Sequence, residues 1–527
     1  MPGKILTDLT TPPNATTPPS GFRSHVKNIS QQSSVFLLGT VFTTLAGYFF
    51  KVYLARTLGA EALGIYALGM TVVGLAGVIA AAGLPQAATR FVAAYSATGD
   101  FRRLGRFLWS AMSVLLAANL IGGLCVMVLR SWIADRFYHT PALASYMHFF
   151  VIIMATGALT GFLGQVLAGY KDVARRTIIT SFVGQSLTMA TTIVLLTLGF
   201  GFRGYLIAQI FSALSVVFLL GRAAWRATPP PARAFQLGLP VLERDIVSFS
   251  AVLLAIQSLE FLAGQTDKVM LGIFLNAREV GIYSIATALV AFVTIFLQST
   301  NQIFAPTIAE LHASRQNELL LSLYQTLTKW VFGLTMPLAF VIMIFARPLM
   351  EIFGREFGEG WPVLVIATLG QLVNCGVGSV GQLLLMSGQQ QKMVRVQAIV
   401  VPIGIAINWL LIPRLGLVGA AVAASATNIL LNALWLRDVQ RSLSILPSRR
   451  GYVLLLPPAL ATLASVWLVR YGLRGFPHGF LSVIAGLVAG YSVFLLSSLA
   501  IGLDANDRML ARSAWDLVRR SVGFNAA

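Results

Sequence analysis

The stretch KVYLARTLGAEALGIYALGMTVV, residues 51–73, returns in the second half of the chain as KVMLGIFLNAREVGIYSIATALV, residues 268–290. The two copies align without a gap and share nine of 23 positions, where composition alone gives about two. The same offset pairs GFLGQVL at 161–167 with GSVGQLL at 378–384. The chain is therefore a duplicated unit, and many transporters are built in this way, with a substrate site between the two halves.

The composition predicts a membrane protein made of helices. Of the 527 residues, 57% are hydrophobic and 11% are charged, whereas about a quarter of a soluble domain is charged. Apolar stretches recur at about 20 residues, the length that an α-helix needs to cross the hydrocarbon of a bilayer. They do not show the alternation that is typical of a transmembrane β-strand. We therefore predict an all-α polytopic membrane protein with about 14 transmembrane helices.

The duplication divides these helices into two parallel six-helix repeats and a C-terminal helix pair. Because six is an even number, both repeats enter the membrane from the same side, and their pseudo-axis lies along the membrane normal. The predicted parts are a disordered cytoplasmic tail (1–32), an N-lobe (33–222), a proline-containing cytoplasmic linker (223–245), a C-lobe (246–436), the helix pair (437–501) and a basic cytoplasmic tail (502–527).

The net charge of +19 is distributed unevenly between the two sides of the membrane. Loops on the side of the N-terminus carry most of the 38 Lys and Arg residues. By the positive-inside rule this side is cytoplasmic, so both termini are expected in the cytoplasm. Attraction to anionic lipid headgroups explains such an excess, and a nucleic-acid partner is not expected.

The sequence contains no recognisable catalytic or metal-binding motif. Cys125 and Cys375 each lie inside a predicted span, and the five His residues are scattered. HExxH, GxSxG, CxxC and Walker-type loops are absent. We expect no catalytic residue, no metal and no cofactor, so that any energy for transport comes from an ion or substrate gradient. A membrane-embedded polymerase or lipid-linked glycosyltransferase is disfavoured, because the short loops leave no room for an acid/base or metal-binding loop.

The first helix of each repeat carries a polar stripe. On a helical wheel one narrow face collects Ser33, Thr40, Thr44, Gly47 and Lys51, and the repeat partners of these residues are Ser250, Gln257, Phe261, Gly264 and Lys268. In the second copy Glu260 and Asp267 lie on or beside this face. Ionisable groups inside a span cost several kcal/mol unless they face water or a partner, which favours a functional role. Snorkelling to the membrane surface is the alternative for the residues near helix ends.

We predict Lys51, Arg90, Gln257 and Lys268 as substrate-binding residues, and Glu260 or Asp267 as the residue that binds a coupling ion. Arg90 follows the second span and can hold a phosphate from the inner end of a cavity, or simply anchor the helix at the cytoplasmic surface. Amides inside the spans can join neighbouring helices or hydrogen-bond a sugar; they are Gln165, Gln185, Gln209, Gln298, Asn301, Gln302, Gln371, Asn374, Gln382, Asn408, Asn428 and Asn432.

The segments LARTLGAEALGIYALG, GLPQAATRFVAAY and TDKVMLGIFLNAREVGIYSIATAL resemble the polysaccharide transporter family, the O-antigen-type flippases of the multidrug/oligosaccharidyl-lipid/polysaccharide exporter superfamily. The resemblance covers about residues 28–440. Its LG-x-x-x-x-G-x-Y signature is intact at Leu58, Gly59, Gly64 and Tyr66, whereas Asn276 replaces the first glycine in the repeat.

This resemblance implies two six-helix lobes that form a V, with two further helices. It implies alternating access that moves an undecaprenyl-pyrophosphate-linked oligosaccharide across a bacterial inner membrane, with a cationic cavity for the pyrophosphate. It also suggests partners, namely membrane lipid and the polymerase and glycosyltransferases of the same pathway. A multidrug or cation antiporter is less compatible with the duplicated lysines Lys51 and Lys268. A lipid II flippase remains open as well, although the arginine-rich first helix of that family is not seen.

Overall fold

The computed structural model describes residues 20–233, 242–447, 449–473 and 479–501, and it confirms an all-helical chain, because no strand occurs in these ranges. The first half consists of α1 (Ser20–Ala81), α2 (Leu84–Thr98), α3 (Phe101–Val128), η1 (Trp132–Phe137), α4 (Ala142–Gly169), α5 (Val173–Thr177), η2 (Ile178–Gly184), α6 (Gln185–Thr197), α7 (Gly201–Ala227) and η3 (Pro230–Ala232).

The second half begins after the linker and extends to the helix pair at the C-terminal side. It consists of α8 (Arg244–Phe274), α9 (Ala277–Val290), η4 (Ala291–Thr294), α10 (Ile295–Ala313), α11 (Asn317–Ile344), α12 (Ala346–Glu351), η5 (Arg355–Gly360), α13 (Trp361–Val377), α14 (Val380–Met386), α15 (Gln390–Leu443), α16 (Arg449–Gly472) and α17 (Gly479–Ile501).

The expected parts of the chain differ from these elements at their edges. Helix α1 already begins at Ser20, directly after the second proline pair, so residues 20–32 of the expected tail continue the first helix, and residues 1–19 lie outside the described residues. The expected linker is partly helical, since α7 continues to Ala227 and α8 begins at Arg244. The expected basic tail, 502–527, lies outside the described residues.

Twelve helices within the described ranges are long and apolar enough to cross a membrane, which makes the chain a multi-pass membrane protein. Two of them, Leu38–Thr98 with 61 residues and Gln390–Leu443 with 54 residues, are far longer than the ~20 residues of one crossing. Each contains a non-helical glycine, Gly59 (φ 78°) or Gly416 (φ 56°). If each of these two helices crosses twice, about 14 crossings result, and this number stays a prediction.

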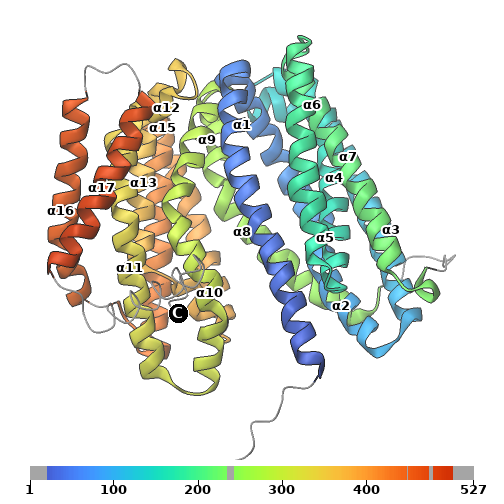
Figure 1. Ribbon diagram of the computed structural model, residues 1–527. Coiled ribbons are helices and arrows are strands. Elements are labelled where there is room, and N and C mark those ends of the chain that lie inside the picture. Colours follow the sequence, from blue (N-terminus) through green and yellow to red (C-terminus); the bar gives the residue numbers. More distant parts are fainter. Residues whose placement is uncertain (1–19, 234–241, 448, 474–478, 502–527) are drawn as a thin grey trace, which may run out of the picture.

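The two halves lie beside each other, with α1 and α8 between them and with α16 and α17 on the outer flank of the second half (Figure 1). Helices α16 and α17 pack on each other and on α11, as expected for a pair added outside the duplication. The largest hydrophobic core joins both halves, since Leu68 and Phe150 belong to the same buried cluster as Ile282 and Val341.

The duplicated signature forms the closest contact between the two halves, where α1 packs against α9. A Cβ atom built on Gly64 would overlap the carbonyl oxygen of Ala277, and a Cβ atom on Gly281 would overlap the carbonyl oxygen of Ala60. Gly64 and Gly281 are repeat partners, and so are Ala60 and Ala277. The two helices therefore cross about a local pseudo-two-fold axis, and each repeat contributes the glycine that admits the backbone of the other. We call this contact the glycine crossing.

The asymmetry of the signature at Gly59 and Asn276 has a local explanation. Gly59 adopts a positive φ, and the helix that follows it begins with the N–H of Ala60 donating to Glu356 Oε1 at 2.8 Å. Asn276 has φ −103° and needs no glycine. Its side chain accepts the N–H of Glu279 at 3.1 Å, and Glu279 accepts the N–H of Asn276 at 3.3 Å, which completes a capping box.

Candidate functional site

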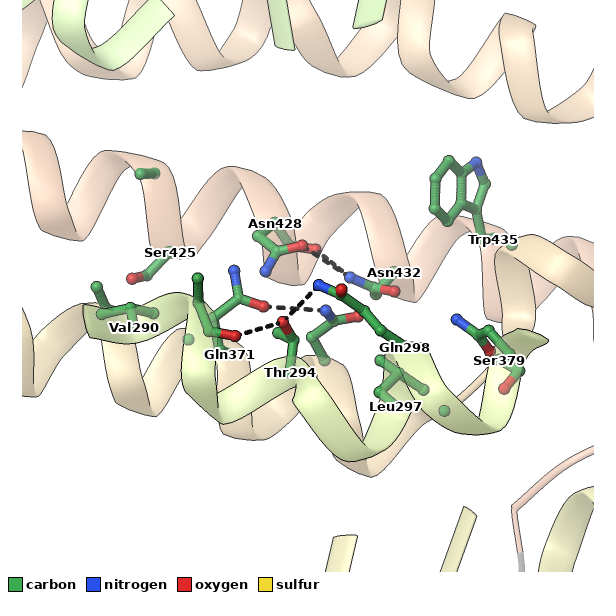
Figure 2. Close-up of a pocket in the computed structure, with 18 of the residues that line it drawn as sticks. Val290, Thr294, Leu297, Gln298, Gln371, Ser379, Ser425, Asn428, Asn432 and Trp435 are labelled. Atoms are coloured by element: carbon green, nitrogen blue, oxygen red, sulfur yellow. Dashed lines mark hydrogen bonds between the residues drawn. The ribbon is translucent and has the colours of Figure 1, made fainter. Parts of the chain in front are cut away.

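A polar cavity of about 610 Å³ lies inside the C-lobe, between α15 on one side and α9, η4, α10, α13 and α14 on the other (Figure 2). Its volume falls within the range of about 300–1,000 Å³ that is typical of small-molecule sites. The polar lining side chains include Asp267, Tyr283, Thr287, Thr294, Gln298, Asn301, Gln371, Asn374, Ser379, Gln382, Ser425, Asn428, Asn432 and Trp435. Seven of the twelve amides that the sequence places inside spans therefore meet in one space.

The amides of the cavity are held in place by partners on their own helices. Gln298 donates to Thr294 Oγ1 at 2.9 Å, and Asn374 donates to Gln371 Oε1 at 3.0 Å. Asn432 donates to the carbonyl oxygen and to the side-chain oxygen of Asn428, both at 2.9 Å. Figure 2 shows Thr294 and Gln298 on one side of the space and Asn428 and Asn432 on the other. Because an amide side chain has two donor hydrogens and two acceptor lone pairs, each pair keeps capacity for a ligand.

Asp267 is the only charged side chain among the described residues that line the cavity. It is partly buried, and its Oδ2 accepts a hydrogen bond from the hydroxyl of the buried Tyr283 at 2.6 Å. The same carboxylate accepts the backbone N–H of Lys268 at 2.8 Å. Asp267 thus connects the cavity to the predicted lysine pair.

The structure brings Lys51 and Lys268 near each other, as their equivalent positions in the two repeats allow. They extend from α1 and α8, which pack together, and their charges act on each other. Lys51 is exposed, whereas Lys268 is partly buried and donates from Nζ to Gln265 Oε1 at 3.1 Å. Two like charges are held at one interface, and no described carboxylate forms a salt bridge with either ammonium group, which favours a site for an anion.

Gln257 joins the two lobes directly. Its amide and that of Gln86 on α2 exchange hydrogen bonds of 3.0 and 3.1 Å. The α2 backbone approaches α8 closely at this end, since a Cβ atom on Gly83 would overlap the carbonyl oxygen of Ser250. In this structure Gln257 therefore acts as a contact between lobes. Its amide nitrogen donates to Gln86 Oε1 and also to the carbonyl oxygen of Leu253 at 3.3 Å, so only its oxygen keeps capacity for a substrate.

Arg90 lies away from the lysine pair. Its guanidinium carbon is 4.4 Å from the centroid of the Phe249 ring on α8. Phe249 and Lys268 are separated along that helix by about 28 Å, at about 1.5 Å of rise per residue. The three predicted cationic positions therefore form no single cluster, because Arg90 stands at one end of α8 and the lysines stand at the other.

Glu260 lies on α8 between these ends and is exposed. Neither a hydrogen bond of its side chain nor an ion pair is found within the described part of the chain. The metal-ligating residue types form no cluster of three or more there either. Of the two carboxylates that the sequence singles out, only Asp267 has a defined partner and borders a cavity.

The C-lobe cavity does not follow from the sequence alone, although the sequence contains a signal for it. Gln371 and Asn374 are three positions apart and Asn428 and Asn432 are four apart, so each pair lies on one helix face. Trp435 continues the face of Asn428 and Asn432. Tertiary packing decides which of these helix faces turn toward each other, and the spacing of residues in the sequence does not predict that arrangement.

The sequence model of the family described as polysaccharide biosynthesis protein matches residues 29–312, more than half of the chain. The probable low-salt glycan biosynthesis flippase Agl15 of Haloferax volcanii is 28% identical over 174 residues. This match covers 32% of the chain and 37% of Agl15, so the chain spans little more than a third of the length of this curated relative.

Solved structures with the same architecture include the lipid II flippase MurJ in an inward closed conformation, with a TM-score of 0.71 and 14% identity, over 88% of this chain and 97% of MurJ. A multidrug resistance MATE family transporter of the MOP superfamily, in an inward-facing conformation, gives a TM-score of 0.61 and 16% identity, over 76% and 94%. These likenesses establish the fold.

Proposed function

The chain belongs to the polysaccharide biosynthesis protein family, and from this premise we propose that it is a transporter that flips a lipid-linked oligosaccharide across the membrane. The substrate is a repeat unit carried on undecaprenyl pyrophosphate, and the protein moves it without chemical change, so it is not an enzyme. The duplicated pair Lys51 and Lys268 is the observation that carries this proposal, because it offers two positive charges at the interface between the repeats.

The pyrophosphate is the part of such a substrate that cannot cross hydrocarbon unaided. Stranding an isolated charge in a medium of low dielectric constant costs tens of kcal/mol in a Born treatment. Lysine ammonium groups replace the lost water, while the lipid tail stays in the bilayer. Arg90, at the opposite end of α8, then meets the headgroup first, and Lys51 and Lys268 hold it further along the path.

The charge distribution supports an orientation with both termini in the cytoplasm of a bacterial cell and the protein in the inner membrane. In this orientation the glycine crossing lies at the outer end and closes it, and the polar contact between Gln86 and Gln257 lies nearer the cytoplasm. Alternating access opens these two ends in turn. The glycosyltransferases that make the repeat unit and the polymerase that uses it are the expected partners.

The direct test is transport of a fluorescent undecaprenyl-pyrophosphate-linked oligosaccharide by the purified protein in proteoliposomes. We expect the protein to expose the probe to a membrane-impermeant quencher faster than protein-free vesicles do. A labelled organic cation and labelled lipid II, tested separately in the same vesicles, should not be transported faster than in protein-free vesicles. Transport of the cation alone would favour a multidrug antiporter, transport of lipid II alone would favour a peptidoglycan precursor flippase, and a rate for the oligosaccharide equal to that of empty vesicles refutes the proposal.

Transport is expected to depend on a proton or sodium gradient through Asp267. The hydroxyl of Tyr283 at 2.6 Å fixes the orientation of this carboxylate at the border of the cavity. Asp267→Asn should remove the dependence of the transport rate on pH or on sodium, because the amide keeps the size but neither ionises nor attracts a cation. Glu260→Gln serves as the comparison. Loss of the dependence in Glu260→Gln alone would assign the coupling to Glu260, and an unchanged dependence in both variants would exclude both carboxylates.

A further inference from the structure

We infer that the C-lobe cavity binds an uncharged sugar of the transported glycan, an assignment that rests on the proposed flippase function and adds the substrate class to it. The cavity is separate from the lysine pair that is proposed for the pyrophosphate, and Asp267 and Lys268 are adjacent residues that join the two sites. One substrate can therefore place its headgroup at the lysines and its glycan between α10, α13 and α15.

The duplication provides an internal control for this assignment. At the constant offset that relates Lys51 to Lys268, Gln371 corresponds to Met154, Asn428 to Phe211 and Trp435 to Phe218. Gln382 is an exception, because Gln165 stands at its partner position. Amides that only joined helices would be needed equally in both lobes, since the helices are duplicated. The polar cavity is thus a property of one lobe and not of the repeated scaffold.

The equivalent region of the N-lobe is filled by side chains. Asp267 corresponds to Phe50, which is buried in a cluster with Leu54 and Tyr205. The ring of Tyr205 lies 5.1 Å from that of Tyr66, the repeat partner of Tyr283. In the C-lobe the partner of Tyr205 is Val422, a much smaller residue. The aromatic side chains of Phe50, Tyr66 and Tyr205 therefore pack together in the N-lobe, whereas Asp267, the partner of Phe50, borders the cavity in the C-lobe.

The paired amides of the lining keep free hydrogen-bonding capacity. Gln298 and Asn374 each donate one hydrogen bond to a neighbouring side chain, so a second donor hydrogen and oxygen lone pairs remain on each amide. Sugar hydroxyls both donate and accept, so they match this spare capacity. The Trp435 ring, which packs over Gly381 at one end of the cavity, adds an aromatic surface.

The charge of the lining restricts the kind of sugar. Asp267 is the only Asp or Glu among the described lining residues, and no described Lys, Arg or His lines the cavity. A uronic or sialic acid would place its carboxylate near Asp267 without a counter-charge, which is costly in a desolvated site. Neutral sugars such as hexoses and N-acetylhexosamines carry the hydroxyl and amide groups that this lining matches.

The test compares three probes on the full-length protein in detergent: a polyprenyl pyrophosphate without sugar, the same lipid with a neutral disaccharide, and the same lipid with a disaccharide that contains a uronic acid. The variant Gln371→Met/Asn428→Leu removes two amides at nearly constant volume. Asn432 keeps its bond to the carbonyl oxygen of residue 428, so the helix retains this contact. The matched control Asn408→Leu lies on the same helix and removes an amide that bonds only to the carbonyl of Gly404.

We expect the wild type to bind the neutral glycolipid more tightly than the other two probes. The double variant should lose about tenfold to hundredfold in affinity for the neutral glycolipid, with unchanged affinity for the sugar-free lipid, and Asn408→Leu should bind all three as the wild type does. Three results would overturn this inference and leave the proposed function standing. The wild type could bind the neutral glycolipid no more tightly than the sugar-free lipid, or no more tightly than the acidic glycolipid. The double variant could also lose the same affinity for every probe. Failure of the wild type to bind any of the probes overturns the proposed function as well.

Discussion

The Gly64→Ala variant is expected to unfold at a lower temperature than the wild type, with a loss of about 1–3 kcal/mol in stability. The added methyl group would overlap the carbonyl oxygen of Ala277 and would stand against backbone, which cannot rotate away as a side chain can. Helices α1 and α9 therefore have to separate along the whole glycine crossing, whose Ala60 and Ala277 belong to the core that joins the two lobes. Thermal unfolding of the detergent-solubilised protein, followed by fluorescence, measures the change.

The pseudo-symmetry of the crossing makes this prediction sharper. Gly281→Ala should have a similar effect, because its methyl group would overlap the carbonyl oxygen of Ala60. Once the helices have separated for one methyl group they accommodate the second more easily, so the double variant should lose less than the sum of the single losses. Gly157→Ala is the control, since a methyl group there meets no atom within 4 Å and alanine favours the helix. Wild-type melting of Gly64→Ala, or full additivity in the double variant, contradicts the crossing.

The scaffold of this protein could be predicted from the sequence because it depends on local and repeated features. Apolar stretches of membrane-spanning length give the helices, and the constant offset between the two copies relates the lobes. The same offset relates Gly199 to Gly416, and both residues have a positive φ in the structure. The duplicated Gly64 and Gly281 are visible as a signature in the sequence, but only the structure shows that they face each other.

The candidate site could be predicted only in part. The lysine pair follows from the duplication, since equivalent residues of two lobes related by a pseudo-axis can approach each other. From the sequence we predict Arg90 together with Lys51 and Lys268 because all three are positively charged. In the structure Arg90 stacks on Phe249, at the other end of α8 from Lys268. The amide cavity could not be predicted because several helices contribute its residues, and tertiary packing decides which helix faces meet.

Simultaneous replacement of Lys51 and Lys268 by alanine is expected to slow translocation of the lipid-linked oligosaccharide about hundredfold. Loss of a desolvated, hydrogen-bonded charge contact costs about 2–5 kcal/mol, and a hundredfold change lies at the lower end of this range. Each single variant should retain part of the activity, because one ammonium group remains for the pyrophosphate. The proteoliposome assay with the fluorescent substrate gives the rate. The control is Lys392→Ala, because Lys392 lies in the first turn of α15 and donates only to Gln389 among the described hydrogen bonds.

A purely structural role of the two lysines predicts a different outcome, and stability separates the two cases. Their charges repel each other in the structure, so the double alanine variant removes an unfavourable interaction. It should unfold at the same temperature as the wild type or higher, although it transports poorly. Arginine at both positions should keep much of the transport and retain the repulsion, since guanidinium groups also bind phosphate. A double alanine variant that transports normally refutes the phosphate site, and one that is inactive and unstable shows that the lysines hold the lobes together instead.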